Sequence, residues 1–301
     1  MYDLIVVGGG PAGLTATIYA IRKRINVLIV SKDLGGKTNY RLALPWVEDY
    51  QVIRGLEIVN KFRSELEYLK FARHMEPVER VDQIEDSFVV RTRGGGELQA
   101  KAVIIATGAK QQRLSVPGER EFIMRGLCYS ATSYAPLFID RKTVVVGEGD
   151  LALRSAAELA TVARHVHLVG ITPQALETVL GKKLQVAENV TILQGYTVTA
   201  VKGNGYASQV LVRSPQGQEE ILEAEGTFIE MNLLPNSQMV AHLVELDPLG
   251  RIKVDEYART SVAGIFAAGD VTDSFAEQVL VAVGEGAKAA LSAYEYLLPV
   301  L

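Results

Sequence analysis

The sequence has little cysteine, little histidine and no large excess of charge, and each shortage excludes a class of protein. One cysteine, Cys128, cannot form an internal disulfide bond, and four scattered histidines predict no metal cluster. With 31 basic and 35 acidic residues, the net charge of −4 excludes the basic surface of a nucleic-acid-binding protein. No apolar run reaches the ~18 residues of a membrane span, and the N-terminus lacks the basic start of a signal peptide. We therefore expect a cytoplasmic protein that binds neither nucleic acid nor membrane.

The length and the first thirty residues indicate an α/β protein of two domains. At roughly 150 residues per domain, a chain of 301 residues is long enough for two. Residues 4–7 form an apolar run typical of a buried parallel strand, and residues 8–13 read Gly-Gly-Gly-Pro-Ala-Gly. Residues 14–24 then predict a helix and residues 27–30 a second strand.

A second copy of this unit predicts a second domain. Residues 144–146 predict a strand, residues 147–152 a turn reading Gly-Glu-Gly-Asp-Leu-Ala, residues 153–162 a helix and residues 166–169 the return strand. The spacing from the first glycine to the end of the return strand is the same in both copies. Such a repeat favours two nucleotide-binding-type folds in one chain.

The remaining elements are predicted by simpler patterns. We expect strands at residues 88–92, 98–105 and 266–268 and a long apolar helix at residues 277–297. Pro117 and Gly118 punctuate the chain before the second unit and are a candidate hinge, and Pro235 and Asn236 are the matching breaker after it.

The first glycine turn has the residues that a dinucleotide diphosphate requires. Gly8 allows the tight turn, Gly10 lets the backbone approach the diphosphate, and Gly13 lets helix and strand pack closely. The helix that follows offers free N–H groups and the positive end of its dipole. The other interpretation is a turn that merely needs small residues, but the position between a strand and a helix favours the ligand site.

The end of the second strand departs from the usual dinucleotide pattern. An acidic residue there would bind the adenosine ribose, whereas this chain has Ser31 followed by Lys32. Ser31 can hydrogen-bond a hydroxyl and Lys32 can approach a phosphate. A solvated turn is an equally good interpretation of the two residues.

Several short stretches stand in the order and spacing of a known family. They are residues 8–13, Gly35-Gly36-Lys37, Val47-Glu48-Asp49, Ala106-Thr107-Gly108, Pro117-Gly118-Glu119, Phe228-Ile229-Glu230, Ala268-Gly269-Asp270 and Glu277-Gln278-Val279. Together they resemble the low-molecular-weight thioredoxin reductases of the pyridine nucleotide-disulfide oxidoreductase superfamily, which are FAD-containing homodimers. The resemblance covers nearly the whole chain.

The resemblance implies two Rossmann-like three-layer domains of ββα type, the second inserted in the first. Residues 1–114 and 240–301 would form the FAD domain, and residues 115–239 a central nicotinamide-binding-like domain. Asp270 would hold the ribityl chain, and the helix starting at Gln278 and Val279 would point its N-terminus at the flavin ring. The implied FAD contacts are Gly8, Gly10, Pro11, Ala12, Gly13, Ser31, Lys32, Gly36, Lys37, Asp49, Val78, Ala106, Thr107, Gly108, Gly269, Asp270, Gln278 and Val279.

The clearest departure from the family lies just before the second glycine turn. The family has Cys-Ala-Thr-Cys-Asp there, and this chain has Ser130-Ala131-Thr132-Ser133-Tyr134. A thiolate is the nucleophile of disulfide exchange, and a serine hydroxyl does not replace it. The catalytic positions implied by the family are therefore Ser130, Ser133 and Tyr134, and Tyr134 is the only acid–base candidate among them. A natural loss and an engineered Cys→Ser replacement would give this same sequence.

The second nucleotide site also departs from the family. After the return strand the family has His-Arg-Arg and a further arginine, which grip the 2′-phosphate of NADP. Here the positions hold Gly170-Ile171-Thr172 and Leu176, and no guanidinium remains to pair with a phosphate. Glu148 places a carboxylate in the turn itself, where it would repel a diphosphate. We expect a degenerate nicotinamide site.

Three functions remain open. The first is an FAD-dependent oxidoreductase that takes electrons from a donor other than NADPH, such as ferredoxin. The second is an NAD(P)H-dependent reductase of ferredoxin or quinones that works without a dithiol. The third is a non-enzymatic flavin-binding dimer. In each we expect a homodimer, with a ferredoxin- or thioredoxin-like redox partner for the enzymes.

The aromatic residues Tyr40, Trp46 and Tyr50 lie in the segment that, in the family, runs beside the flavin. They are able to stack on it, but packing in the core is the better interpretation. His165 and His167 flank an apolar strand and are interpreted as ordinary histidines.

Overall fold

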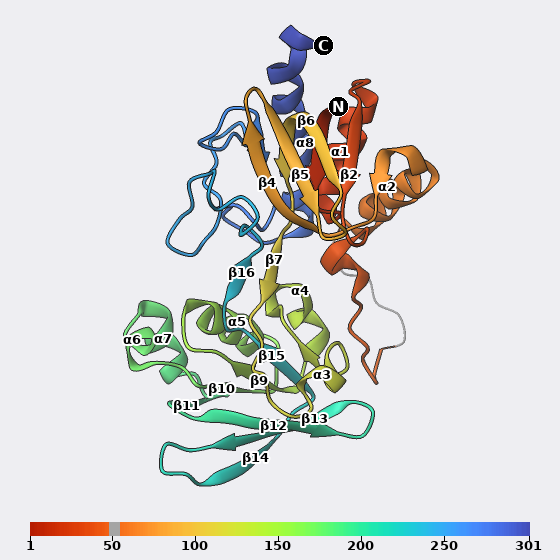
Figure 1. Ribbon diagram of the computed structural model, residues 1–301. Helices are drawn as coiled ribbons and strands as arrows, with labels where there is room; N and C mark the ends of the chain where they lie inside the picture. The colour runs from red at the N-terminus through yellow and green to blue at the C-terminus, as the bar shows by residue number, and fades with distance from the viewer. Residues whose placement is uncertain (48–54) are drawn as a thin grey trace. The chain divides into compact units, whose positions relative to one another are not determined.

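The chain forms two compact units in the computed structural model, which describes residues 1–47 and 55–301 (Figure 1). Among these, residues 1–39, 55–110 and 234–301 make up unit 1, and residues 40–47 and 111–233 make up unit 2. The chain crosses between the units through β7 (Ala109–Gln111) and β16 (Leu233–Pro235), which pair with each other. Pro117 and Gly118, the candidate hinge of the sequence, lie inside unit 2.

Unit 1 is built on a mixed sheet with strand order β3-β2-β1-β6-β5-β4, in which β17 also pairs with β6. The strands are β1 (Tyr2–Val7), β2 (Val27–Val30), β3 (Arg73–His74), β4 (Val78–Ile84), β5 (Ser87–Thr92), β6 (Glu97–Ile105) and β17 (Ile265–Ala267). The strands β1, β2, β3, β6 and β17 pair in parallel, and β4 and β5 continue from β6 as an antiparallel meander. The continuous apolar runs of β1 and β2 are buried because both faces of the sheet are covered.

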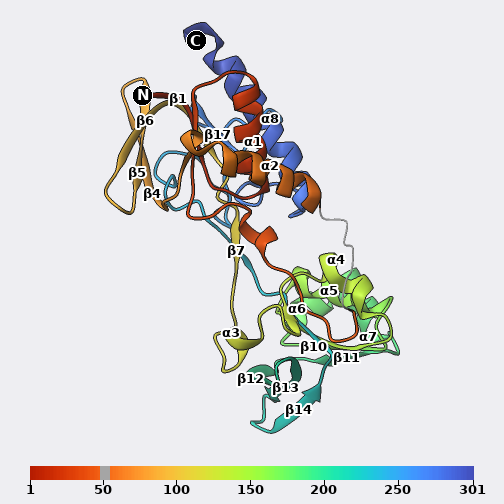
Figure 2. The ribbon, with the colours of Figure 1, turned by 90° about the vertical axis from the view of Figure 1, so that its right-hand side faces the viewer.

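The helices of unit 1 cover one face of this sheet (Figure 2). They are α1 (Pro11–Arg22), α2 (Leu56–Tyr68) and α8 (Val279–Leu297), with short 3₁₀ turns η1 (Gly36–Asn39), η2 (Lys70–Ala72) and η4 (Leu298–Val300). The α1 and α8 helices pack on each other through small residues, because Ala16 and Ala20 lie with the alanines of α8 in one buried core. The α1 helix starts at Pro11, directly after the glycine turn, and not at the expected residue 14, because the fixed φ of proline suits the first helical position.

Unit 2 repeats this arrangement with a parallel sheet of order β11-β10-β9-β15-β8. The strands are β8 (Leu127–Cys128), β9 (Lys142–Val146), β10 (His165–Val169), β11 (Val190–Leu193) and β15 (Gly226–Ile229). The helices are α3 (Glu119–Phe122), α4 (Ala131–Tyr134), α5 (Asp150–Ala160), α6 (Pro173–Leu176) and α7 (Val179–Gln185), with the 3₁₀ turn η3 (Ala135–Phe138). The α5 helix begins three residues before the expected residue 153, because it too starts at its glycine turn.

A separate antiparallel sheet of β12 (Thr197–Gly203), β13 (Ala207–Arg213) and β14 (Glu219–Glu223) covers the other face of the parallel sheet in unit 2. Val144 and Val146 of β9 pack with Val201, Val210 and other residues of that meander in one buried core. The helices pack on the opposite face in a second core. Each unit is thus an α/β fold of three layers, as the sequence predicts.

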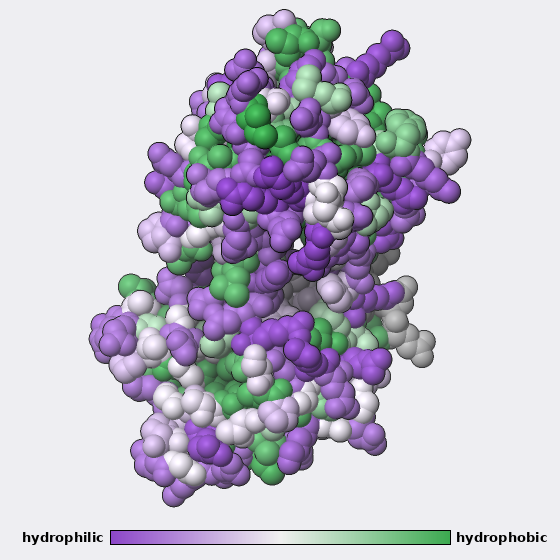
Figure 3. Space-filling view, viewed as in Figure 1, coloured by the Kyte–Doolittle hydropathy of each residue, from purple (hydrophilic) through white to green (hydrophobic). Residues whose placement is uncertain are grey.

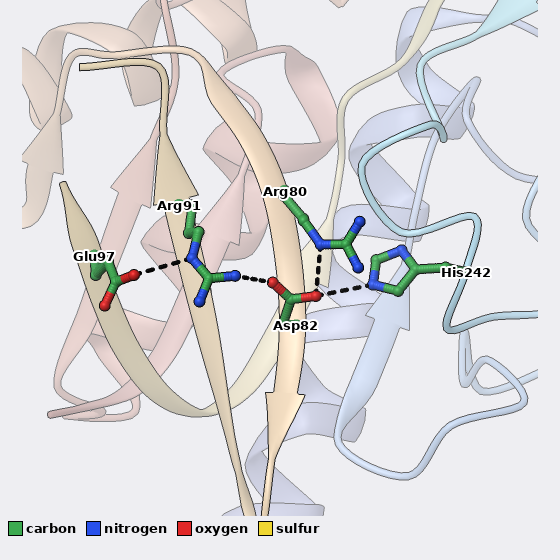
Figure 4. Close-up of polar contacts among 5 residues, drawn as sticks. All are labelled: Arg80, Asp82, Arg91, Glu97 and His242. Carbon is green, nitrogen blue, oxygen red and sulfur yellow. Dashed lines mark hydrogen bonds and ion pairs between the residues drawn. The ribbon is translucent and has the colours of Figure 1, made fainter. Parts of the chain in front are cut away.

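An ion-pair network ties the meander of unit 1 to a loop that follows β16 (Figure 4). Asp82 on β4 accepts hydrogen bonds from Arg80 (2.7 Å), from Arg91 on β5 and from the ring of His242 (3.1 Å). Arg91 also donates to Glu97 at 3.0 Å. Partial burial alone would raise the pKa of Asp82, but the hydrogen bonds from Arg80 and His242 and the charges of the two arginines lower it.

In the part of the chain that the structure describes, no helix combines the length and the apolar composition needed to span a membrane. Hydrophilic side chains cover much of the face drawn in Figure 3, with apolar side chains between them.

Candidate functional site

The glycine turn between β1 and α1 has the geometry of a diphosphate cradle. Gly8 has a φ of +111°, and a Cβ there would lie 2.3 Å from the carbonyl oxygen of Ala106. A Cβ on Gly13 would lie 1.8 Å from the oxygen of Gly8, so the close contact of helix and turn requires glycine. A Cβ on Gly10 would meet nothing within 4 Å. The backbone is therefore packed at the first and third glycines and open at the second, where a diphosphate approaches.

The N-terminus of α1 is suited to an anion. Gly10 precedes the helix without a side-chain cap, and the first turn, which starts with Pro11 and Ala12, contains no acidic residue. The free N–H groups and the dipole of the helix are thus not compensated by the chain itself.

The η1 turn brings a lysine to this cradle. Gly35 donates its N–H to the carbonyl of Gly9 at 2.7 Å, and a Cβ on Gly36 would lie 3.2 Å from the Cα of Gly10. Lys37, the next residue, forms an ion pair with Asp270 at 2.8 Å. Two of the residues implied as FAD contacts, far apart in the sequence, are therefore in direct contact.

Ser31 and Lys32 at the end of β2 are placed differently from each other. Ser31 is 8% exposed, and its hydroxyl donates to the carbonyl of Asp33 at 2.7 Å. The hydroxyl oxygen of Ser31 keeps its ability to accept a hydrogen bond from a ribose. Lys32 is exposed and lies 3.7 Å from the carboxylate of Asp33. At the end of β2 the structure thus places a buried serine hydroxyl, where the usual dinucleotide pattern has an acidic side chain.

The segment after β6 is held by a residue that the sequence did not assign to the site. Ala106 lies against Gly8, and Thr107 and Gly108 follow it. Asn236 donates its side-chain N–H groups to the carbonyls of Thr107 (2.9 Å) and Gly108 (3.1 Å), and the Thr107 hydroxyl donates to the carbonyl of Asn236 at 2.7 Å. The sequence marked Asn236 only as a chain breaker. No local signal points to its contact with residues 107–108.

The other wall of the site follows β17. Gly269, with a φ of +77°, and Asp270 turn the chain away from the sheet. The loop leads to Gln278, which caps α8 with an extended backbone, and to Val279, the first residue of the helix. The α8 helix approaches α1 very closely, because a Cβ on Gly286 would lie 2.1 Å from the carbonyl oxygen of Ala12.

The implied FAD contact Val78 lies on the edge strand of the sheet. Val78 starts β4, pairs with Thr92 and packs on the core of the other sheet face. Asp49 lies outside the described residues, as does Tyr50.

The serines at the catalytic positions lie together in unit 2. Ser130 precedes α4, and its hydroxyl donates to the hydroxyl of Ser133 at 3.1 Å. Tyr134 is 6% exposed and packs among the apolar side chains of the core beneath the helices. Cys128 is fully buried in the same core.

A buried carboxylate anchors this segment. Glu230, 2% exposed at the end of β15, accepts the N–H of Ala131 at 2.8 Å. Its carbonyl oxygen would lie 2.2 Å from a Cβ on Gly147, the first glycine of the second turn. Glu230 thus links the Ser130–Ser133 segment to the second turn, a role that the sequence did not indicate.

The second glycine turn is open at its second glycine, as the first turn is, but it carries a different charge. A Cβ on Gly149 would meet nothing within 4 Å, as at Gly10. However, Glu148 is exposed in the turn and Asp150 opens α5. Ile171 is fully buried and Leu176 is 7% exposed, both in the core of unit 2. Two of the three positions where the family has arginine therefore face the protein interior. The third, Thr172, is half-buried, and its hydroxyl accepts the N–H of Ala175 at the start of α6.

The aromatic and histidine residues have structural surroundings. Trp46 packs edge-on against Phe138 with the guanidinium of Arg141 4.4 Å from its ring, so the prediction of core packing is confirmed for it, whereas Tyr40 is exposed. The ring centroids of His165 and His167 lie 4.7 Å apart. Burial lowers the pKa of His167 to about 4, and neighbouring positive charges lower it further as a smaller cause. The described residues contain no group of three or more His, Cys, Asp or Glu side chains arranged to hold a metal.

Comparison with known proteins gives a family match over most of the chain. The profile of the pyridine nucleotide-disulphide oxidoreductase family matches residues 2–286. The chain is 36% identical over 307 residues to an alkyl hydroperoxide reductase component of Pseudomonas aeruginosa, covering 99% of this chain and 58% of that protein. It is 32% identical over 300 residues to an NADH dehydrogenase of Bacillus subtilis, covering 99% and 59%. The chain thus spans somewhat more than half the length of these relatives.

Solved structures agree over the whole chain. The thioredoxin reductase of Streptococcus pyogenes has a TM-score of 0.88 at 33% identity, and that of Giardia duodenalis has 0.85 at 27% identity. Each alignment covers 99% of both chains. FAD is the cofactor of this family. The open Gly10, the uncapped N-terminus of α1 and the Asp270 wall fit that cofactor in unit 1.

Proposed function

Because the chain belongs to the pyridine nucleotide-disulphide oxidoreductase family, we propose that it transfers electrons through FAD held in unit 1, without an internal dithiol. The observation that carries this proposal is the hydrogen-bonded pair of Ser130 and Ser133, whose Oγ atoms are 3.1 Å apart. Two serine hydroxyl groups supply no thiolate and form no reversible disulfide. The electrons must therefore leave the cofactor for an acceptor outside this pair.

Different residues of unit 1 would bind different parts of the FAD molecule. The turn of residues 8–13 and the start of α1 would bind the diphosphate, with Lys37 as a neighbouring positive charge. Ser31 would accept from the adenosine ribose, and Asp270 would hold the ribityl chain. The N-terminus of α8 would face the flavin ring. Bound FAD would supply the electron chemistry, accepting either a hydride or single electrons.

The other contacts implied by the family complete the proposed site. They are Gly36, Asp49, Val78, Ala106, Thr107, Gly108, Gly269, Gln278 and Val279.

We further propose that the electron donor is not NADPH. Ile171 and Leu176 are buried where arginines would have to reach a 2′-phosphate. Glu148 adds negative charge at the turn that would receive the diphosphate. A donor that needs no bound nicotinamide, such as a ferredoxin-like protein, satisfies both observations.

A second candidate is an NADH-dependent reductase without a dithiol. The similarity to an NADH dehydrogenase of Bacillus subtilis favours it. NADH has no 2′-phosphate, so the buried Ile171 and Leu176 do not argue against this donor. Glu148 does.

Anaerobic stopped-flow absorbance at the flavin band separates these functions. We expect reduced ferredoxin to bleach the flavin within seconds, NADPH at micromolar concentration to bleach it at least about 100-fold more slowly, and thioredoxin not to be turned over. Rapid bleaching by NADH would select the second candidate. Rapid bleaching by NADPH would contradict the proposed loss of the second site. No bleaching by any donor would leave a flavin-binding protein without this activity.

We also propose that the protein is a homodimer, as are the low-molecular-weight thioredoxin reductases that the sequence resembles. Each chain has a mass of 32.7 kDa, so multi-angle light scattering should give twice this value. A monomer mass at micromolar concentration would contradict the dimer.

A further inference from the structure

One carboxylate on α8 holds the loop that carries Asp270. Glu285 accepts the backbone N–H of Gly269 with its Oε2 at 2.8 Å. Its Oε1 accepts the hydroxyl of Ser274 at 2.5 Å. The loop from residue 269 to residue 278 is thus fixed at its first residue and near its middle by the same side chain.

The hydrogen bond to Gly269 fixes a residue of unusual conformation. Gly269 has a φ of +77°, and its carbonyl accepts both the N–H and the hydroxyl of Thr272 at 2.9 Å. Asp270 lies inside this tight turn, with its carboxylate 2.8 Å from Lys37. The position of the Asp270 carboxylate therefore depends on the amide that Glu285 holds.

Glu285 is itself held at a fixed place relative to the glycine turn. The next residue, Gly286, lies against the carbonyl of Ala12 in the first turn of α1, where a Cβ would come within 2.1 Å. A helix packed this closely cannot slide along its neighbour without a clash. The Glu285 carboxylate thus relates the Asp270 loop to the cradle at Gly10.

The first part of the loop is also held by the main chain at Ile252, whose N–H donates to the carbonyl of Val271 (2.9 Å) and whose carbonyl accepts the N–H of Asp273 (3.1 Å). The part that follows reaches the surface. Phe275 is fully exposed, and the outer side of the loop borders a cavity of about 440 Å³ that Glu285 and Lys288 also line. Side chains in contact with solvent constrain a loop weakly, so the hydrogen bond from Ser274 to Glu285 is an important restraint on the exposed part of the loop.

We propose that Glu285 is the positioning residue that sets the affinity of the chain for FAD, by holding the Gly269–Asp270 turn against the diphosphate cradle. This inference rests on the proposed placement of FAD in unit 1. The carboxylate contacts the protein backbone and Ser274, and it acts on the cofactor through Asp270.

Titration of the apo-protein with FAD, followed by flavin fluorescence, tests this role. Glu285→Met keeps the length of the side chain but removes both acceptors, and it should weaken FAD binding about 10-fold or more. Glu285→Gln keeps an acceptor for Gly269 and a polar group for Ser274, and should stay within about threefold of the parent. Glu295→Met, at an exposed position of the same helix, should leave the affinity unchanged.

Hydrogen exchange of the apo-protein gives a readout that does not depend on FAD. Exchange at the Gly269 amide should be faster in Glu285→Met than in the parent and close to the parent in Glu285→Gln. Ser274→Ala, which removes one donor only, should weaken FAD binding about two- to fivefold, and it decides the question if Glu285→Met does not fold.

The outcomes separate the two proposals. Unchanged FAD affinity in both Glu285→Met and Ser274→Ala would overturn the role of Glu285 and leave the FAD site standing. Equal loss in Glu285→Met and Glu285→Gln would also overturn it, because the hydrogen bonds would then not be the cause. If the parent chain bound no FAD, the proposed function would fail first.

Discussion

The two glycine turns of this protein are both open at their second glycine and differ in charge. In unit 1 the turn packs at Gly8 and Gly13, opens at Gly10 and leads to a helix with no acidic residue in its first turn. In unit 2 the turn is open in the same way at Gly149, but Glu148 precedes that glycine and Asp150 follows it. The comparison teaches that a glycine leaves such a turn open, whereas the neighbouring side chains set the charge that an anion would meet there.

The surroundings of the turns widen this difference. In unit 1, Lys37 is brought to the cradle by η1 and is held there by Asp270. In unit 2, the positions that would supply positive charge are occupied by Ile171 and Leu176, which are buried in the core. A positive side chain thus lies near the first turn, whereas Ile171 and Leu176 after the second turn pack in the core of unit 2.

The largest expected effect breaks the first turn and leaves the second as the control. Gly10→Glu fills the open side of the cradle with a negative side chain and should weaken FAD binding by more than about 100-fold, or about 2.8 kcal/mol. Gly149→Glu makes the same change in unit 2 and should leave FAD affinity unchanged. Both are measured by FAD titration of the apo-protein. Full FAD binding by Gly10→Glu would show that the cofactor is held elsewhere.

The next effect concerns the serines of unit 2. The double variant Ser130→Cys/Ser133→Cys should form a disulfide, because the hydroxyl oxygens already lie 3.1 Å apart and the Cys-x-x-Cys spacing permits a short loop. Thiol titration of the unfolded protein should find one cysteine under oxidising conditions and three after reduction. The single variant Ser130→Cys is the matched control, with two thiols in both states. Three thiols in the oxidised double variant would contradict the geometry.

Restoring the acid of the family should damage the fold rather than improve the chemistry. Tyr134 is 6% exposed in the core of unit 2, so Tyr134→Asp buries a carboxylate among apolar side chains. We expect a loss of about 2–4 kcal/mol in the free energy of unfolding of unit 2. Tyr134→Phe keeps the ring and should cost about 1 kcal/mol or less. Urea unfolding measures both, and equal stability of Tyr134→Asp and the parent would show that the position is open to solvent.

The same logic sharpens the account of the missing arginines. Leu176→Arg places a charge in a position that is 7% exposed and should lower the stability of unit 2 by about 2–3 kcal/mol. NADPH affinity, measured by calorimetry, should not rise. Gain of NADPH binding without loss of stability would mean that the position faces a working phosphate site.

The smallest effect is pH-dependent and lies in the scaffold of unit 1. The pKa of Asp82 is lowered in the folded chain, so its ion pairs stabilise the fold above the unfolded pKa of about 3.9 and lose this effect as the pH falls through the folded pKa. Asp82→Asn should cost about 1 kcal/mol at pH 7, and the cost should vanish near pH 2. Urea unfolding at both pH values measures the difference. A cost that persists at pH 2 would assign the effect to packing.

The sequence alone determined the two strand–turn–helix units, the strands β5, β6 and β17, the long helix α8 and the close packing at Gly8 and Gly13. These features are local, because hydrophobic period and glycine spacing act over a few residues. Helix starts were misjudged by two to three residues, since the residues that cap a helix have no apolar signal of their own.

Only the tertiary structure decided which distant residues complete the site. Asn236 meets Thr107, Lys37 meets Asp270, and Glu230 meets Ala131 across separations of roughly a hundred residues or more, which no local pattern reports. The burial of Ile171 and Leu176 was also decided only by the tertiary structure. The sequence shows that neither residue is an arginine, but it does not show whether their side chains are buried. Packing against the helices of unit 2 shows that they belong to its core, because burial is a property of the neighbours that folding brings together.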